Sequence, residues 1–389
     1  MHLRNVLYPG LLLTALLPAT ASAQTIDTVA GNGTTVDTGD GGSATTAGIG
    51  YPTGVVAAPD GGFYIGGYNI VRHVSADGRI RTVAGNGTSG SSGDGGPATA
   101  ALVQGNISGL ALGADGSLFI GEIFAVRKVS PAGIISTVAS HPAGATALAL
   151  DAAGNLYIGA GCVVTKMAPG GALSRFAGTG QCGPTAGDGG PATDATMTAN
   201  IYGVAVDASG NVWLADNWAH RIRRVGKDGV IHTVTSDVWS PMGLSAAANG
   251  DVYAADLSGA MVWRLDSTGT ASVVAGTPYV SGFSGDGGAA TEATLDMPWG
   301  VSVGSGRLLI VDTRNNRIRS VSADVLPVPV RPAITCASEG YTGTKLTWCQ
   351  NVCEKGYTGA TLDMWIHRWV NRYRDLPYCA VEGNVAQLK

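Results

Sequence analysis

The chain has 389 residues, of which 59 are glycine and only 13% are charged, and its formal net charge is −4 at pH 7. A weakly acidic chain without a long basic run is unsuited to non-specific nucleic-acid binding, which depends on neutralising phosphates with Lys and Arg. Glycine at about twice its ordinary frequency favours short strands joined by tight turns over a helical fold. Beyond the N-terminus no segment approaches the ~20 continuous apolar residues of a membrane-spanning helix, so we expect no transmembrane segment.

Residues 1–23 have the three parts of a secretory signal peptide. His2 and Arg4 give a basic start, Leu11–Leu17 form a short apolar core, and Ala21–Ala23 supply the small residues that precede a cleavage site. We therefore expect this segment to be removed on export. The cleavage region has no cysteine for lipid attachment, so the periplasm and the extracellular medium stay open as alternatives.

From residue 24 to residue 325, one unit of roughly fifty residues recurs six times. Its clearest copy contains four short apolar runs separated by Gly-Asn, Asp-Gly and similar turns, at Gly203–Asp207, Gly210–Asp216, Arg221–Val225 and Gly229–Val234. Four-stranded meanders of this kind are propeller blades, and small residues suit the innermost strand because it is crowded around the axis. We therefore predict an all-β, six-bladed β-propeller over residues 24–325.

The two ends of the repeat region complement each other. The last unit stops after Arg317–Val321 without its outer strand, whereas Ile26–Gly31 matches the outer strand of the first complete unit at Thr82–Gly85. We predict that the N-terminal strand completes the last blade, which closes the ring with backbone hydrogen bonds and removes a free edge.

The run Asp312–Arg319, of sequence Asp-Thr-Arg-Asn-Asn-Arg-Ile-Arg, and its counterpart Asp216–Arg223 resemble the signature of NHL-repeat propellers. The Thr-Val-Ala-Gly and Gly-Asp-Gly-Gly-Pro-Ala-Thr segments resemble the bacterial exported branch of that family. The resemblance covers about residues 25–325. Blades 1, 2, 3 and 5 lack the Asn-x-Arg-Ile pattern, so their faces are expected to differ.

One face of such a propeller carries the loops between second and third strands together with the inter-blade loops, each of which leads into the next blade; we call it the loop-rich face. The inter-blade loops of blades 1, 2, 4 and 6 contain a Gly-Asp-Gly-Gly motif, with the acids Asp40, Asp94, Asp188 and Asp286. Four further acids end second strands at the same face: Glu122, Asp216, Asp256 and Asp312. These carboxylates could bind calcium or another divalent ion, or each could cap its own turn by accepting backbone N–H bonds.

Aromatic and cationic residues also gather on or near the loop-rich face: Tyr68, Phe124, Trp218, His220, Trp239, Phe283, Trp299 and Arg314. From these and the acids, our candidates for ligand binding are Trp218, His220, Arg314, Asp216 and Asp312. Long ordered loops on a rigid scaffold are where recognition usually resides, and the short turns of the opposite face offer little side-chain surface.

No catalytic constellation can be assembled from the sequence. Related six-bladed lactonases and lyases hold a metal in the channel through inner-strand carboxylates, histidines or asparagines, whereas these inner strands supply Val, Ala, Leu and Ser. Gly300–Gly304 fits the nucleophile-elbow pattern, yet Ser302 falls in an inner strand and lacks the required strand-turn-helix context. We therefore predict no resident cofactor, apart from a possible calcium or other divalent ion.

Six cysteines in a chain addressed to an oxidising compartment favour three disulfides. Cys162 and Cys182 fall on the same face of adjoining blades and should pair. After a proline-rich linker at 326–332, a small cysteine-rich and helical domain is predicted at 333–389, stapled by Cys336, Cys349, Cys353 and Cys379 in an order that the sequence leaves open. Its Trp365 and Trp369 either form a miniature core or present a recognition surface.

These observations favour a monomeric, exported binding or scaffold protein that uses the loop-rich face to bind a protein, a peptide or a cell-envelope glycan. The alternative is an enzyme of the lyase or lactone-hydrolase type with a metal in the channel.

Overall fold

The structure, a computed structural model, describes residues 24–141 and 144–322. The predicted signal peptide, the linker, the cysteine-rich segment and its four cysteines lie outside the described residues. Within them, no helix is both long enough and apolar enough to cross a membrane.

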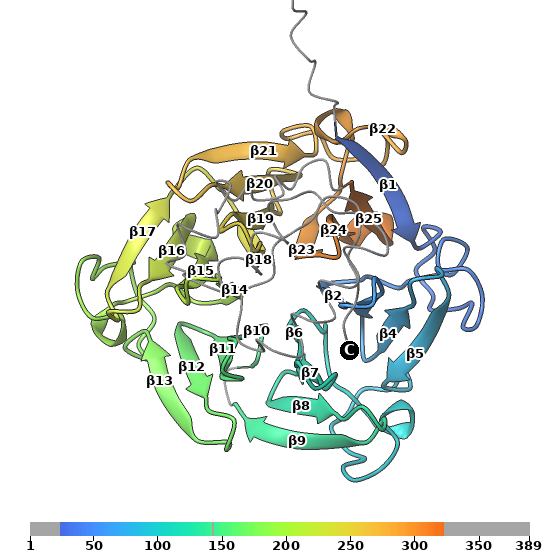
Figure 1. Ribbon diagram of the computed structural model, residues 1–389, viewed down its shortest axis with the longest axis horizontal. Coiled ribbons are helices and arrows are strands. Elements are labelled where there is room, and N and C mark those ends of the chain that lie inside the picture. Colours follow the sequence, from blue (N-terminus) through green and yellow to red (C-terminus); the bar gives the residue numbers. More distant parts are fainter. Residues whose placement is uncertain (1–23, 142–143, 323–389) are drawn as a thin grey trace, which may run out of the picture. The chain divides into compact units, whose positions relative to one another are not determined.

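Six antiparallel sheets are arranged as blades around a central axis, which confirms the predicted six-bladed β-propeller (Figure 1). In each blade the strands run from the axis outwards. Blade 1 holds β2 (Gly54–Ala57), β3 (Phe63–Gly66), β4 (Val71–Val74) and β5 (Ile80–Ala84). Blade 2 holds β6 (Leu110–Leu112), β7 (Leu118–Gly121), β8 (Ala125–Val129) and β9 (Ile135–Ser140). Blade 3 holds β10 (Ala147–Leu150), β11 (Leu156–Ala160), β12 (Val163–Met167) and β13 (Leu173–Ala177).

The second half of the ring repeats this order. Blade 4 holds β14 (Ile201–Val206), β15 (Val212–Asp216), β16 (Arg221–Val225) and β17 (Ile231–Thr235). Blade 5 holds β18 (Pro241–Ala246), β19 (Val252–Asp256), β20 (Met261–Leu265) and β21 (Ala271–Ala275). Blade 6 holds β23 (Pro298–Gly304), β24 (Arg307–Asp312), β25 (Arg317–Val321), the N-terminal β1 (Thr25–Ala30) and the short β22 (Gly288–Ala289). Single 3-10 turns lie in the loops, at η1 (Ala98–Ala100), η2 (Ala192–Asp194), η3 (Asn217–Ala219), η4 (Ala290–Glu292) and η5 (Thr313–Asn315).

The N-terminal strand closes the ring, as the sequence predicted. β1 pairs antiparallel with β25, with Ile26 opposite Val321 and Thr28 opposite Arg319. The Ser322 N–H adds a bond to the Thr25 carbonyl at 3.0 Å. The first and last described residues therefore lie together at the face opposite the loop-rich face, which carries the short turns and which we call the short-turn face.

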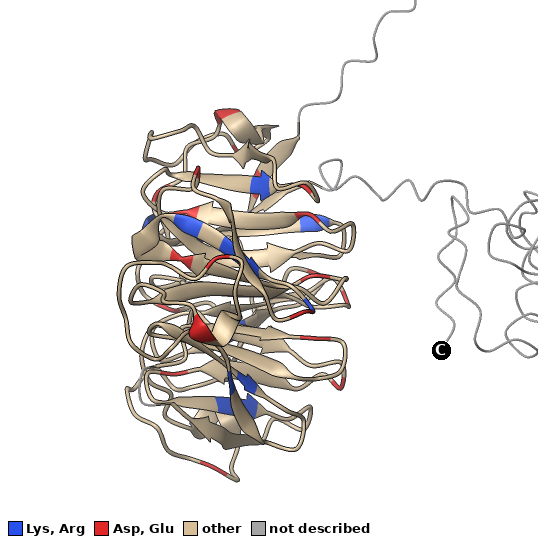
Figure 2. Ribbon diagram, turned by 90° about the vertical axis from the view of Figure 1, so that its left-hand side faces the viewer, with Lys and Arg blue, Asp and Glu red and all other residues tan. Residues whose placement is uncertain are grey.

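Small residues line the axis because the inner strands approach each other closely. A Cβ added at Gly203 would lie 2.1 Å from the carbonyl oxygen of Met242 in the next inner strand, a separation that atoms do not tolerate. Larger apolar side chains point sideways into clusters between blades, such as the one that joins Val55 and Phe63 of blade 1 to Leu309 and Val311 of blade 6. Charged residues are sparse and of mixed sign when the disc is seen edge-on (Figure 2).

Replacing Ile26 by Ala should lower the free energy of unfolding by about 2–4 kcal/mol, because the side chain is fully buried at the closing seam. The neighbouring exposed Thr25 is the control, since Thr25→Ala should change stability by no more than ~0.5 kcal/mol. Urea unfolding measures both. Equal stability of Ile26→Ala and the unsubstituted chain would mean that β1 is not part of the ring.

Candidate ligand-binding face

The loop-rich face concentrates the exposed apolar side chains of the described residues. Of the twelve large apolar side chains that stay exposed, ten belong to the inter-blade loops or to loops between second and third strands: Val36, Tyr51, Tyr68, Ile123, Phe124, Trp218, Trp239, Tyr279, Val280 and Phe283. The other two, Ile134 and Leu173, lie at the start of outer strands. Aromatic residues are enriched at binding interfaces and are costly to leave in water, so this distribution marks the face as a candidate interface.

The densest part of this face is an aromatic cluster of Trp218, His220 and Trp239, which joins blades 4 and 5. The chain leaves β15, makes the single turn η3, and re-enters β16 through His220, whose left-handed φ of +54° ends the turn. The His220 ring stacks on Trp239 with centroids 4.3 Å apart and planes inclined by 13°. Trp218 and Trp239 are 67% and 55% exposed, so both offer ring surface to a ligand.

Two polar contacts hold the aromatic cluster in place. His220 Nδ1 is bonded to the carbonyl oxygen of Trp239, which can only accept, so Nδ1 carries a proton. Asn217 Nδ2 donates to the Pro241 carbonyl at 3.0 Å and thereby ties η3 to the first residue of β18. The cluster is thus fixed to two rigid blades before any ligand arrives, which lowers the entropic cost of binding.

The acids that end second strands are buried beneath the face and already bonded. Asp216 is fully buried and accepts from Thr185 Oγ1 at 2.8 Å and from the Thr198 N–H at 3.1 Å. Asp312 is also fully buried and accepts from the Asp296 N–H and from Asn315 Nδ2, both at 2.8 Å. Burial raises the pKa of Asp312 to about 6 despite these bonds.

Asp256 and Glu122 have the same kind of setting. Asp256 accepts from the N–H groups of Trp239 and Ser240 at 3.0 Å, and Glu122 accepts from Ser91 Oγ at 3.0 Å. Burial raises the pKa of Glu122, against the hydrogen bond from Ser91 and the charge of Arg127. Each of these carboxylates therefore positions an inter-blade loop, and the ligand candidates Asp216 and Asp312 present no surface to a ligand in this conformation.

The four acids of the Gly-Asp-Gly-Gly motifs form a second set, in which each carboxylate pairs with a buried arginine from the third strand of its own blade. The pairs are Asp40–Arg72, Asp94–Arg127, Asp188–Arg223 and Asp286–Arg319, and the arginine side chains are at most 2% exposed. Arg223 also donates to the loop carbonyls of Thr196 at 3.0 Å and Ala186 at 3.1 Å. We call each of these arrangements a latch, because it fastens an inter-blade loop to its blade.

Latches occur only where the loop is long. Blades 3 and 5, whose inter-blade loops are short and lack the motif, have Thr165 and Trp263 at the position of the arginine. Burial opposes ionisation of Asp94, yet its bonds to Thr137 and Arg127 keep the pKa of that carboxyl below the usual value. The Gly-Asp-Gly-Gly part of these loops follows the outer strand at the circumference of the disc (Figure 1).

The candidates are thus brought together only in part. Trp218 and His220 lie on blade 4, with Trp239 stacked on His220, whereas Arg314 is exposed on η5 of blade 6, on the far side of blade 5 from η3. Tyr51 and Tyr279 escaped the sequence analysis. Both adopt positive φ in inter-blade loops, at +44° and +61°. No turn motif in the sequence predicts this conformation for a tyrosine.

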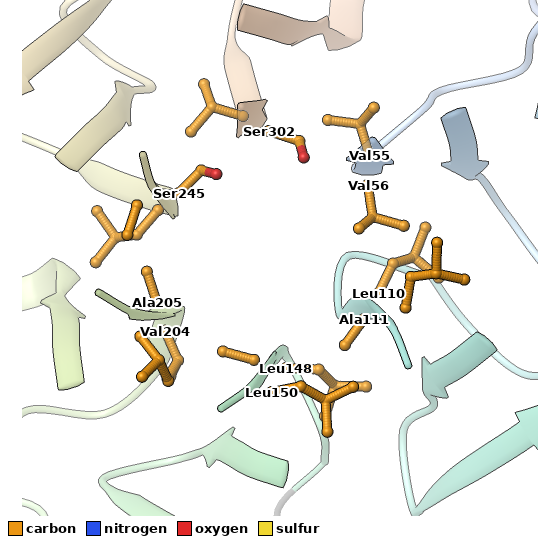
Figure 3. Close-up of a pocket in the computed structure, with 16 residues that line it drawn as sticks. Val55, Val56, Leu110, Ala111, Leu148, Leu150, Val204, Ala205, Ser245 and Ser302 are labelled. Atoms are coloured by element: carbon orange, nitrogen blue, oxygen red, sulfur yellow. The ribbon is translucent and has the colours of Figure 1, made fainter. Parts of the chain in front are cut away.

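The central channel has aliphatic walls and encloses about 210 Å³ (Figure 3). Its polar side chains are Ser245 and Ser302. Ser302 Oγ accepts from the Ala57 N–H, and Ser245 Oγ accepts from the Val303 N–H, both at 3.0 Å. The two hydroxyls therefore join neighbouring inner strands. Among the described residues no three His, Cys, Asp or Glu side chains are grouped as metal ligands would be.

The short-turn face is not as featureless as the sequence suggested. A hollow of about 690 Å³ spans blades 1 to 3 and is lined mainly by apolar residues, including Pro59 and Phe119. Lys128 lies 5.3 Å from the Phe119 ring centroid and pairs with Asp115 at 3.5 Å, and the remaining charged residue of the hollow is Asp151.

The predicted disulfide between Cys162 and Cys182 is present. It joins the loop between the second and third strands of blade 3 to the inter-blade loop of blade 4. No cysteine of the described residues is free.

Comparison with known proteins identifies the repeat. A model of the teneurin NHL domain matches residues 80–239 and a model of the NHL repeat matches residues 295–319, and each range contains one of the two signature runs. Teneurin-3 of Danio rerio is 28% identical in an alignment of 263 positions that covers 55% of this chain, and the chain spans only 10% of that relative's length.

Solved structures that superpose with a TM-score above 0.5 share the fold at low sequence identity. An auxiliary nutrient binding protein from Bacteroides ovatus superposes with a TM-score of 0.56 at 14% identity, covering 77% of this chain and 76% of that chain. Streptogramin B lyase superposes with a TM-score of 0.48 at 13% identity, covering 77% of this chain and 98% of that chain.

Substituting Asp188 by Ala should cost about 2–4 kcal/mol of stability, because it leaves the guanidinium of Arg223 buried without its counter-charge. Burial opposes ionisation of Asp188, but bonds from Thr233 and Arg223 lower its pKa, so its contribution is present above the unfolded value near pH 4 and fades below it. Denaturant unfolding should show that the variant is less stable than the unsubstituted chain at pH 7 and that the difference in free energy of unfolding shrinks in acid. Asp194→Ala, an exposed acid in the same loop, is the matched control; equal losses from both would refute the latch.

Proposed function

The chain carries a β-propeller of the NHL-repeat family, and we propose that it is a binding protein that holds a protein, peptide or glycan ligand on its loop-rich face. The observation that carries the proposal is the gathering of ten of the twelve exposed large apolar side chains in the loops of that face. Binding energy at interfaces is concentrated in a few aromatic anchors, and the aromatic cluster supplies two exposed tryptophans, one of them stacked on His220.

Charge supports the same choice of ligand. Of the acids near the aromatic cluster, Asp216 and Asp256 are buried and bonded, whereas Asp237, two residues before Trp239, is exposed. The cluster therefore presents ring faces with an acid, and no basic patch, beside them. A surface of this kind favours a ligand with apolar or neutral polar groups over nucleic acid, whose phosphates require a basic face.

We also propose that the protein acts in the periplasm or outside the cell. The signal-like segment at 1–23 supports export, and the disulfide between Cys162 and Cys182 suits an oxidising compartment.

An enzyme of the lyase or lactone-hydrolase type, with a calcium or other divalent ion in the channel, is the alternative. The channel supports the binding function over this alternative, because its lining side chains include no carboxylate, histidine or asparagine, and the hydroxyls of Ser245 and Ser302 already accept backbone bonds.

Replacing both Trp218 and Trp239 by Ala should weaken capture of the ligand by about a hundredfold, as expected for two hot-spot aromatics, while the melting temperature stays unchanged because both side chains are exposed. A glycan, peptide and cell-envelope binding screen identifies the ligand, and titration of the variant against it measures the loss. Ile134→Ala, an exposed apolar residue away from this face, should bind like the unsubstituted chain. Loss of binding in the Ile134 variant alone would place the ligand elsewhere.

Metal analysis separates the two functions. We expect the purified and dialysed protein to contain well under one divalent ion per chain. A stoichiometric ion that is released when Ser245 and Ser302 are both replaced by Ala would instead favour the channel enzyme.

A further inference from the structure

The outer strand of a blade has one unpaired edge, and in four blades an inter-blade loop covers it. In blade 4 the Gly189 N–H donates to the Ile231 carbonyl at 2.8 Å, and the Ile231 N–H donates to the Gly190 carbonyl at 3.1 Å. The same loop-to-strand bonds reach Ile80 in blade 1 and Ile135 in blade 2, and the Gly287 N–H reaches the Ile26 carbonyl in blade 6. These four isoleucines are fully buried.

Blade 3 keeps the apolar residue at this position but has no covering loop. Leu173 is the counterpart of Ile231, since Leu173 faces Met167 across the blade as Ile231 faces Val225. Yet Leu173 is 48% exposed. In the inter-blade loop of blade 3, His141 and Ala145 donate to carbonyls of the loop after β7, which keeps their segment at the loop-rich face.

The backbone edge of β13 is open for the same reason. In blades 1 and 2 the N–H two residues after the isoleucine, at Thr82 and Thr137, points outwards to the loop acid. Arg175 stands at the equivalent position of β13, two residues after Leu173. Because β13 pairs with β12 in the same register as in the other blades, the N–H of Arg175 and the N–H and carbonyl of Leu173 point away from β12. Among the residues that the structure describes, no loop is bonded to them.

Blade 5 shows how an uncovered edge is otherwise made harmless. It too lacks the covering loop, but it carries the small Ala271 where blade 3 carries Leu173. Blade 3 therefore combines an open backbone edge with an exposed apolar side chain, the combination that recruits another strand.

The four covered blades also show what fits the edge. In each of them two alanines of the loop pack in the same cluster as the isoleucine, for example Ala192 and Ala195 with Ile231, and Ala98 and Ala101 with Ile135. In blade 3 the arginine of the latch is replaced by Thr165, so a segment bound there needs no acid.

We propose that the β13 edge, formed by Leu173 to Arg175, binds an extended segment of a partner polypeptide by strand addition. The segment takes the place that the inter-blade loop holds in the covered blades: it is neutral, small residues follow the backbone of β13, and alanines cover Leu173. Main-chain hydrogen bonds supply most of the affinity and the apolar contact supplies selectivity. This site lies on the circumference and is independent of the loop-rich face.

The probe is a fluorescent peptide with the sequence of residues 93–103 of this chain carrying Asp94→Asn, titrated against the full protein by fluorescence anisotropy. We expect saturable binding. Arg175→Pro removes the outward N–H of an edge strand, where proline is tolerated, and should weaken binding by at least about tenfold. Leu173→Lys should do the same by removing the apolar contact and charging the edge.

Ser174→Lys is the matched control, because it adds the same charge to an exposed position of β13 whose backbone bonds face β12; it should bind within about twofold of the unsubstituted chain. Thermal melts verify that all three variants are folded, and Leu173→Lys keeps the test valid if Arg175→Pro unfolds. Absence of saturable binding, or equal binding by the Leu173 and Ser174 variants, would overturn the proposal. The protein could instead form concentration-dependent dimers that compete with the peptide and that Leu173→Lys abolishes. That result would mean that the partner at this edge is a second copy of the chain.

Discussion

The latch between a buried third-strand arginine and a loop aspartate is the interaction on which the outer half of this propeller depends. A four-stranded blade pairs its two middle strands on both sides but leaves the outer strand with an open edge at the circumference, and open edges invite association with other chains. The inter-blade loop covers that edge only if it descends along the blade, and its glycine-rich backbone has little intrinsic reason to do so. The arginine supplies the reason, since its charge is buried beneath the loop and its donors reach both the aspartate and the loop carbonyls.

This use of charge determines what remains for ligand binding. Eight acids were predicted to lie on the loop-rich face, where they could bind an ion. In the structure four of them form latches and four are buried supports of the loops. With those carboxylates occupied, the loop-rich face presents aromatic rings as its most accessible groups. The same supports fix the rings: Asp256 holds the N–H groups of Trp239 and Ser240, and Asn217 holds β18. The candidate site is therefore pre-organised by residues that never touch a ligand.

Features that depend on neighbouring segments of sequence could be predicted. Alternation of apolar residues and turn pairs identified the strands, the missing outer strand implied closure by β1, and face assignment placed Cys162 beside Cys182. The latch could not be foreseen in this way, because Arg223 and Asp188 are 35 residues apart and meet only after the loop folds back. A signal was nonetheless present: at one equivalent position of the third strand, the four blades with the Gly-Asp-Gly-Gly motif carry arginine, and the two without it carry Thr165 and Trp263. The acids were instead assigned to ions or to their own turns, since a sequence shows local capping more readily than distant pairing.

Blades 3 and 5 have no latch, and the side chain that stands in place of the arginine has a different effect in each. In blade 5 the third-strand position became Trp263, whose ring nitrogen bonds to Asp256 at 3.2 Å and so strengthens the support of the loop beside the aromatic cluster. In blade 3 that position is Thr165, which His141 approaches at 3.2 Å, and no segment among the described residues covers Leu173. An uncovered apolar edge is an aggregation hazard, and blade 5 avoids it by carrying the small Ala271 at this position. Blade 3 differs from the other five in that the exposed Leu173 lies on an outer strand whose backbone edge is uncovered.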